Sequence, residues 1–307
     1  MTNPTWTTSA DPAEVVALVS AVYAVDGRPV PPPDGSLPAD FRGGLHLLAR
    51  SAEDLVGYAH LNTEGDAFGR QVGEVFVRPA ERGMGIGGAL LRALAEKAGV
   101  KLDAPAGDAL RVWSHGDHPA AAVLAGRLGF TRARELLRMR RPLTDLPDEP
   151  APPAGVRIRT FVPGQDEAAV IAVNARAFSW HPEQGALTEG ELRAEESESW
   201  FDPAGFLLAV DSENTLLGFH WTKVHESGAA GDEPGVPMGE VYVVGVDPDA
   251  QGSGLGRVLT VVGLRYLAQR RGVDRVMLYV EGDNAPAIGL YERLGFDRWD
   301  SDVQYAH

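Results

Sequence analysis

The sequence predicts an α/β protein built from two similar domains, each a mixed, mostly antiparallel sheet flanked by helices. The duplication is predicted by two motifs that occur twice in the same order. The segment 75–87, VFVRPAERGMGIG, aligns without gaps with 244–256, VGVDPDAQGSGLG. The tetrapeptide Arg-Leu-Gly-Phe then occurs at 127–130 and again at 293–296. Two ordered matches at nearly constant spacing indicate a duplicated folding unit.

A proline-rich and acidic stretch separates the two copies. Residues 141–155 read RPLTDLPDEPAPPAG, and prolines at this density cannot continue a helix or a central strand. We therefore expect a first domain at 1–141, a semi-stiff linker at 142–155 and a second domain at 156–307.

Each half is expected to have the same order of elements. In the first half these are a helix at 12–22, strands at 45–50 and 57–62, an apolar strand ending at Val77, a helix at 86–98 and a strand at 109–113. In the second half they are a strand at 156–161, a helix at 166–177, strands at 206–211 and 217–223, an apolar strand ending at Val246, a helix at 255–269 and a strand at 275–280. Strands interleaved with helices predict a mixed sheet.

Composition and charge exclude several classes of function. The chain has 307 residues, 44% of them hydrophobic, and a formal net charge of -15, so nucleic acids and anionic membranes are not expected partners. The absence of cysteine excludes disulfides and thiolate metal sites. The N-terminal residues lack the basic and apolar regions of a signal peptide, so we expect a cytoplasmic protein. Nothing in the sequence suggests a coiled coil or an exposed apolar stripe, so we expect a monomer.

The two glycine-rich turns are candidate phosphate sites. Each turn (Arg82-x-x-Gly85-x-Gly87 and Gln251-x-x-Gly254-x-Gly256) follows an apolar strand and precedes an expected helix. Glycine allows positive φ and close approach, so the helix N-terminus can present backbone N–H groups to a pyrophosphate. One such turn alone is more simply a strand-to-helix connection. Two in the same context resemble the acyl-CoA loop of GCN5-related N-acetyltransferases (GNATs) and imply acetyl-CoA as cosubstrate, with a cradle in each half.

The halves differ at the segment that follows. Residues 283–296, DNAPAIGLYERLGF, closely resemble the terminal GNAT segment, in which an asparagine contacts the cofactor and a tyrosine lies near the thioester sulfur. The resemblance assigns these roles to Asn284 and Tyr291, with Tyr291 as the general acid for the departing thiolate. The first half has His118 and Ala125 at these positions, so we expect it to be catalytically degenerate. Taken alone, Tyr291 is equally well a packed core tyrosine.

Longer strings narrow the resemblance to one family. The segments 177–185 (AFSWHPEQG), 200–205 (WFDPAG), 218–225 (GFHWTKVH) and 239–246 (GEVYVVGV) are similar to those of mycothiol synthases, which are tandem GNATs. The resemblance covers nearly the whole chain. Members of that family acetylate the cysteinyl amine of a cysteine–glucosamine–inositol conjugate (desacetylmycothiol) in the last step of mycothiol biosynthesis. A thiol-sugar is therefore the implied substrate.

The resemblance also implies the site residues. Glu240 takes the role of general base and Tyr291 that of general acid. The implied substrate contacts are Asp34, Glu183, Lys223, Glu240 and Tyr279. The implied acetyl-CoA contacts in the second half are Val244, Gly245, Val246, Gln251, Gly252, Ser253, Gly254, Leu255, Gly256, Arg257, Asn284, Ala285, Pro286, Ala287, Ile288 and Gly289. Those in the first half are Val75, Phe76, Val77, Gly83, Met84, Gly85, Ile86, Gly87 and Gly88.

Several alternatives stay open at this level. By position alone, Glu240 is a solvated glutamate at the start of a strand, and Asp34 lies in a proline-rich loop where a solvated aspartate is as good an interpretation. The spacing of His181, His220 and His225 matches no usual metal motif, so no metal is expected. Two other functions compete with the family assignment. One is a tandem acetyltransferase for another amine, and the other is a non-catalytic acetyl-CoA-binding protein.

Overall fold

The computed structural model describes residues 5–7, 9–28, 37, 41–181, 184–225 and 236–307. The strands are β1 (Thr5–Thr7), β2 (Leu45–Ser51), β3 (Asp54–Asn62), β4 (Gln71–Val77), β5 (Leu110–His115), β6 (Thr131–Pro142), β7 (Arg157–Thr160), β8 (Phe206–Val210), β9 (Leu216–His225), β10 (Met238–Val246), β11 (Arg275–Glu281) and β12 (Asp297–Ala306). The longer helices are α1 (Pro12–Asp26), α2 (Ile86–Lys97), α3 (Pro119–Arg127), α4 (Glu167–Ala177), α5 (Glu189–Glu196), α6 (Leu255–Gln269) and α7 (Ala285–Arg293).

Over these residues the strands form one continuous 12-stranded sheet in the order β1-β2-β3-β4-β5-β12-β6-β11-β10-β9-β8-β7. The pairs β4–β5 and β10–β11 are parallel, and the other pairs are antiparallel. The predicted fold class, a mixed and mostly antiparallel sheet flanked by helices in each half, is confirmed. Helix α1 begins at an Asp11 N-cap whose side chain accepts from the Ala13 N–H, and it ends at Gly27 with φ of 69°.

Helices cover both faces of each half, and the strands alternate between the two cores. In the first half, Tyr58 packs toward α1 and the adjacent Ala59 packs toward α2 and α3. In the second half, Val243 packs in the cluster under α4 and α5, whereas Val241 packs against α6 and α7. Tyr58 and Ala59 alternate with period 2, whereas a register shift at Tyr242 puts Val241 and Val243 on opposite faces although they are two places apart. Each half therefore has a core on either side of its sheet.

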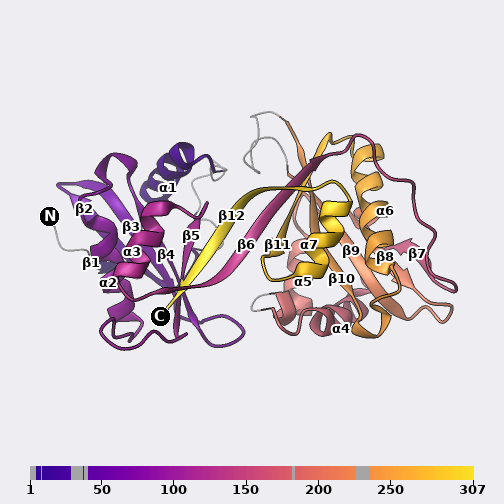
Figure 1. Ribbon diagram of the computed structural model, residues 1–307, viewed down its shortest axis with the longest axis horizontal. Helices are drawn as coiled ribbons and strands as arrows, with labels where there is room; N and C mark the ends of the chain where they lie inside the picture. The colour runs from indigo at the N-terminus through magenta and orange to yellow at the C-terminus, as the bar shows by residue number, and fades with distance from the viewer. Residues whose placement is uncertain (1–4, 8, 29–36, 38–40, 182–183, 226–235) are drawn as a thin grey trace.

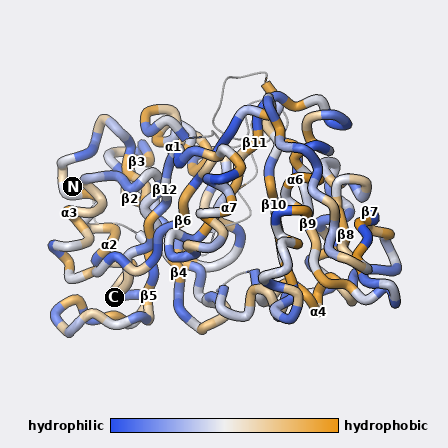
Figure 2. The backbone as a smooth tube through the Cα atoms, turned by 45° about the vertical axis from the view of Figure 1, so that its right-hand side comes forward, coloured by the Kyte–Doolittle hydropathy of each residue, from blue (hydrophilic) through white to orange (hydrophobic). Residues whose placement is uncertain are grey.

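The last strand of each half pairs across the boundary between the halves. Strand β6 follows α3 of the first half but pairs with β11 of the second, from Leu136 to Pro142. Strand β12 ends the second half but pairs with β5 of the first, and β6 and β12 also pair with each other. Figure 1 shows both strands running between the two halves, and Figure 2 shows them in mainly hydrophilic colours. The sequence repeat did not predict this exchange.

Charged side chains join the halves beside the exchanged strands. Arg28, at the end of α1, forms ion pairs with Asp300 and Asp302 of β12. His115 lies 2.9 Å from Glu74 and 3.6 Å from Asp302. Although burial opposes a charge on His115, the two carboxylates raise its pKa to about 10. The cluster therefore favours the charged imidazolium form of His115 at the boundary.

Candidate active site

Two glycine-rich turns lie at the N-termini of α2 and α6. Gly83 and Gly85 have φ of 81° and 85°, and Gly252 and Gly254 have φ of 78° and 84°, a region that glycine adopts without strain. Gly85 and Gly254 are the N-cap residues, and no side chain caps either helix in the described part of the chain. A Cβ at any of the four positions would meet nothing within 4 Å. Both turns are open and can accept an anion.

Each turn follows a point where two parallel strands separate. Strand β4 pairs with β5 only from Gln71 to Glu74, and β10 pairs with β11 only from Gly239 to Val241. Beyond these points β4 and β10 remain paired with β3 and β9, through Val77 and Val246. The residues 75–77 and 244–246 therefore keep one backbone edge free of strand pairing, and this edge leads directly to the glycine turn.

The two splayed strands are not identical. The register of β10 with β9 shifts between Val241 and Val243, whereas β4 pairs with β3 without a shift. The extra residue is Tyr242. A bulge at this place changes the direction of the neighbouring side chains. The second half therefore has a strand irregularity next to Glu240 that the first half does not share.

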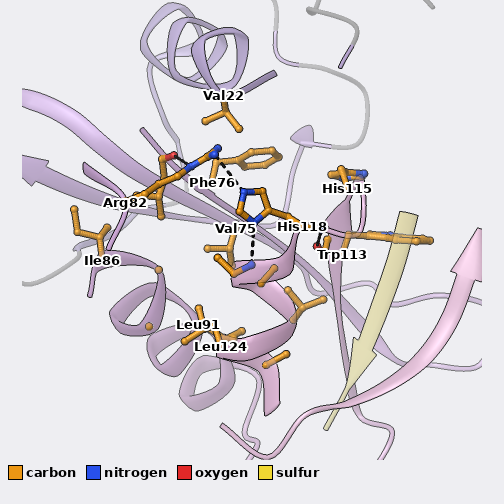
Figure 3. Close-up of a pocket in the computed structure, with 18 of the residues that line it drawn as sticks. Val22, Val75, Phe76, Arg82, Ile86, Leu91, Trp113, His115, His118 and Leu124 are labelled. Atoms are coloured by element: carbon orange, nitrogen blue, oxygen red, sulfur yellow. Dashed lines mark hydrogen bonds between the residues drawn. The ribbon is translucent and has the colours of Figure 1, made fainter. Parts of the chain in front are cut away.

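In the first half, a cavity of about 370 Å³ lies where β4 and β5 separate. The first-half residues that the sequence implied as acetyl-CoA contacts all line it except Met84, which is exposed. Val22 of α1 and Leu124 of α3 contribute apolar walls (Figure 3). An elongated thioester with one phosphorylated end suits a space of this kind, in which apolar walls lead to an open helix N-terminus.

A guanidinium stands beside the turn in this cavity. Arg82 donates to Asp26 at 2.7 and 2.8 Å, and its Nη1 lies 3.4 Å from Nε2 of His118 (Figure 3). Nδ1 of His118 accepts the Ala120 N–H, so this histidine caps α3. At the position of Arg82 the second half has Gln251, whose amide donates to the Val246 carbonyl at 3.2 Å. The first cradle thus has a guanidinium, paired with Asp26, where the second has an amide.

In the second half, Glu240 lies within β10, next to its last residue paired with β11. It is 5% exposed and sits opposite Lys223 of β9 and Met277 of β11. One carboxylate oxygen, Oε2, lies 2.6 Å from Nε2 of His225. The sequence placed Glu240 at the head of the strand, but β10 begins earlier, at Met238, so the side chain is enclosed by strands on both sides.

Aromatic rings surround the ammonium group of Lys223. Its Nζ lies 4.0 Å from the ring centre of Trp200 and 4.7 Å from that of Tyr242. The Tyr242 hydroxyl donates to both carboxylate oxygens of Glu195, at 3.1 Å each. Burial raises the pKa of Glu195, with the Tyr242 hydrogen bond and Lys223 opposing the shift. Cation–π contacts hold the lysine in one place beside Glu240.

Among the predicted substrate contacts that the structure describes, Tyr279 is the exposed one, with 42% of its surface accessible. It lies on β11 two residues after Met277, and the guanidinium of Arg138 is 5.7 Å from its ring centre. Arg138 also lies 4.2 Å from the ring centre of Trp299. Glu240 is paired directly with Lys223 and Met277, and Tyr279 lies two residues after Met277. Glu240, Lys223 and Tyr279 therefore share one face of the sheet.

Tyr291 lies on α7, on the opposite face. It belongs to the core cluster that contains Val241 and Leu278, the last paired residues of β10 and β11. Burial raises the pKa of its hydroxyl to about 12, so the group carries its proton at neutral pH. None of the described residues is hydrogen-bonded to this hydroxyl. At the equivalent place in the first half, Ala125 is buried.

The remaining predicted residues are placed as follows. Asn284 is the N-cap of α7, and its side chain accepts the Ala287 N–H at 3.2 Å, so 284–289 form the start of this helix. Asp34 and Glu183 lie outside the described residues.

Sequence reasoning missed several side chains that the fold brings to the site. These are His225, Trp200, Tyr242, Glu195 and Arg138. A sequence signal was present for His225. It lies two places after Lys223 on the same strand, so the two side chains must share a face of the sheet.

The described residues contain no group of three or more potential ligands arranged to hold a metal ion. None of the described helices combines the length and apolarity needed to cross a membrane.

Comparison with known proteins identifies the family. The acetyltransferase (GNAT) family model matches residues 173–296, and an acetyltransferase (GNAT) domain model matches 42–132. The mycothiol acetyltransferase of Saccharomonospora viridis is 56% identical over 95% of this chain and 94% of its own length. The chain belongs to the mycothiol acetyltransferase family. The mycothiol acetyltransferase of Actinosynnema mirum is 50% identical over the full length of both chains. This family member is an N-acetyltransferase with two tandem GNAT domains.

Solved structures agree on the fold of this acetyltransferase. A GCN5-related N-acetyltransferase from Sphaerobacter thermophilus superimposes with a TM-score of 0.69 at 22% identity, covering 99% of this chain and 95% of its own. A tandem GNAT protein from the clavulanic acid biosynthesis pathway gives a TM-score of 0.68 at 20% identity, covering 99% and 98%. At these identities the similarity concerns the arrangement of the two halves and not their substrates.

Proposed function

We propose that the second half transfers the acetyl group of acetyl-CoA to the cysteinyl amine of desacetylmycothiol, the last step in mycothiol biosynthesis. One observation carries this proposal. The open glycine turn at 251–257 lies beside the point where β10 and β11 separate, with the carboxylate of Glu240 on one face of the sheet and Tyr291 on the other. The curated relatives named mycothiol acetyltransferase support the choice of substrate.

The reaction assigns a proton to each of the two groups. Glu240 accepts a proton from the ammonium group, directly or through water, and the free amine attacks the thioester carbon. The C–N bond forms, the nitrogen loses its second proton to solvent, the C–S bond breaks, and the thiolate of coenzyme A takes the proton of Tyr291, which solvent then restores. A hydroxyl that stays protonated at neutral pH suits this acid role. The turn at 251–257 and the helix start at 284–289 hold the pyrophosphate and the adjoining arm.

The polar groups beside Glu240 suit a polyhydroxylated substrate. Lys223 supplies a fixed cation, and Tyr279 supplies an exposed hydroxyl and ring. Buried polar partners discriminate strongly, because an analogue that lacks a hydroxyl leaves them unpaired. We propose that these residues, with Glu183 and Asp34, bind the pseudo-disaccharide.

We propose that the first half holds a second acetyl-CoA without turning it over. The cavity and the open turn support binding, whereas Ala125 offers no proton at the position of Tyr291. The proposed division follows 1–141 and 156–307, joined by the linker 142–155, in a cytoplasmic monomer.

A substrate panel tests this function. The protein is mixed with acetyl-CoA and separate amines, including the cysteinyl glucosamine–inositol conjugate, a polyamine and a peptide amine, and the acetylated products are measured by mass spectrometry. We expect the conjugate to react with the highest kcat/KM. Equal or faster acetylation of another amine would remove the proposed substrate, and no acetylation at all would favour a binding protein.

A further inference from the structure

The carboxylate proposed as the base is hydrogen-bonded to a histidine that the mechanism has not used. His225 and Glu240 lie on the neighbouring strands β9 and β10, whose register pairs Lys223 with Glu240 and Met238 with His225. His225 is therefore the diagonal neighbour of Glu240 on the same face of the sheet, within reach of a long side chain. Nε2 of His225 lies 2.6 Å from Oε2 of Glu240.

We propose that His225 is a positioning residue that orients Glu240 for removal of the amine proton. This inference rests on the proposed function. An ionised carboxylate only accepts hydrogen bonds, so Nε2 of His225 carries the proton and donates it. The bond fixes Oε2 and leaves Oε1 to accept from the substrate amine or from a water molecule between them. Both side chains are largely buried, with 20% of His225 and 7% of Glu240 accessible, so the pair is held by its surroundings.

The other charged and titratable groups that face Glu240 are engaged elsewhere. Lys223 of β9 lies against aromatic rings, and Tyr242 of β10 donates to Glu195. Tyr279 of β11 lies against Arg138 of β6. Among the described residues, His225 is the side chain that is hydrogen-bonded to Glu240. Within the described part of the chain, His225 is therefore the donor that orients this carboxylate.

The first half contains a contrasting pair. His115 and Glu74 also join an imidazole to a carboxylate, at 2.9 Å, beside the point where β4 and β5 separate. There a second carboxylate, that of Asp302, lies 3.6 Å from the same ring, and the imidazole stays charged. Among the described residues His225 has a single carboxylate partner. The pair in the first half is a fixed ion cluster, whereas the pair in the second half leaves one carboxylate oxygen for a substrate.

Two variants separate positioning from folding. His225→Ala removes the donor, and His225→Gln keeps an N–H near the place of Nε2. With the amine that the wild type acetylates fastest, we expect His225→Ala to lower kcat about tenfold, the effect of losing one hydrogen bond to a charged group. His225→Gln is expected to recover most of the lost kcat, with the KM for acetyl-CoA unchanged in both variants.

A double-mutant cycle with Glu240→Gln decides whether His225 acts through Glu240. We expect His225→Ala to have no further effect on kcat once Glu240 is an amide, because the oriented carboxylate is gone. An equal loss in both backgrounds would overturn the proposal, and so would an unchanged kcat in the single variant. If another amine replaces the cysteinyl conjugate as the best substrate, the proposed function fails, but the cycle on that amine still decides the role of His225. If no amine is acetylated, both fail.

Discussion

The two glycine turns provide a matched pair of substitutions that assigns turnover to one half. Gly85 and Gly254 occupy the same N-cap position, with φ of 85° and 84°, and a Cβ at either would meet no neighbour within 4 Å. Alanine at each therefore costs stability only through the left-handed backbone, by about 1–2 kcal/mol. We expect similar falls in Tm, of a few degrees, for Gly85→Ala and Gly254→Ala.

The effect on activity is expected to differ. At Gly254 the methyl group occupies the space next to the N–H groups that we propose bind the pyrophosphate. Loss of one charge-assisted hydrogen bond, about 1.5–3 kcal/mol, raises the KM for acetyl-CoA roughly ten- to a hundredfold. Turnover is followed by the loss of thioester absorbance, because both coenzyme A and the substrate carry thiols. We expect Gly85→Ala to leave kcat/KM nearly unchanged. The reasoning is refuted if Gly85→Ala slows turnover as much as Gly254→Ala does.

Three further outcomes are expected. His220 is fully buried, and burial lowers its pKa to about 4. A histidine in the unfolded chain has a pKa of about 6.5, so the unfolded state binds the proton first as pH falls. The stability that His220 contributes is therefore present above pH 6.5 and is lost as pH falls toward 4. Urea unfolding between pH 7 and pH 5 should show a loss about 2 kcal/mol larger in the wild type than in His220→Asn, and equal losses in the two proteins would contradict this. Deletion of 297–307 removes β12, which pairs with β5 and β6, so circular dichroism should show loss of folded structure in the first half as well as the second, whereas an intact first half would argue against the exchange. Lys223→Met should raise the KM for the amine with little change in kcat, and an unchanged KM would exclude Lys223 from substrate binding.

Much of each half could be predicted from local sequence because the relevant signals are local. The glycine turns require positive φ at fixed positions, and the helices after them carry an apolar face with helical periodicity, so Ile86 and Leu255 mark the first helical residues as expected. His118 and Asn284 align in sequence, and both cap their helices.

The exchange of β6 and β12 could not be predicted in this way. A strand pattern of period 2 fixes which residues share a face but does not name the partner strand. Because the two repeats are similar, the last strand of each could pair with the sheet of its own half or with that of the other half. The ion pairs of Arg28 with Asp300 and Asp302 favour the observed choice, and they join residues from opposite ends of the chain.

The site was predicted in part for the same reason. Glu240 and Tyr291 come from motifs, whereas the contact between His225 and Glu240 depends on the register of two strands joined by a connection of more than ten residues. The ring cage of Lys223 needs Trp200, which lies before β8 and far from β9 in the chain. Asp34 and Glu183, outside the described residues, stay predictions.

The role of Tyr291 as the acid is tested most directly by the kcat of Tyr291→Phe. The substitution removes one oxygen that has no partner among the described residues, so folding and the heat of acetyl-CoA binding should be unchanged. We predict that kcat falls about a hundredfold or more, the usual contribution of a general acid. A kcat within about twofold of the wild type would contradict the assignment of this hydroxyl, and with it the claim that Tyr291 makes the second half catalytic.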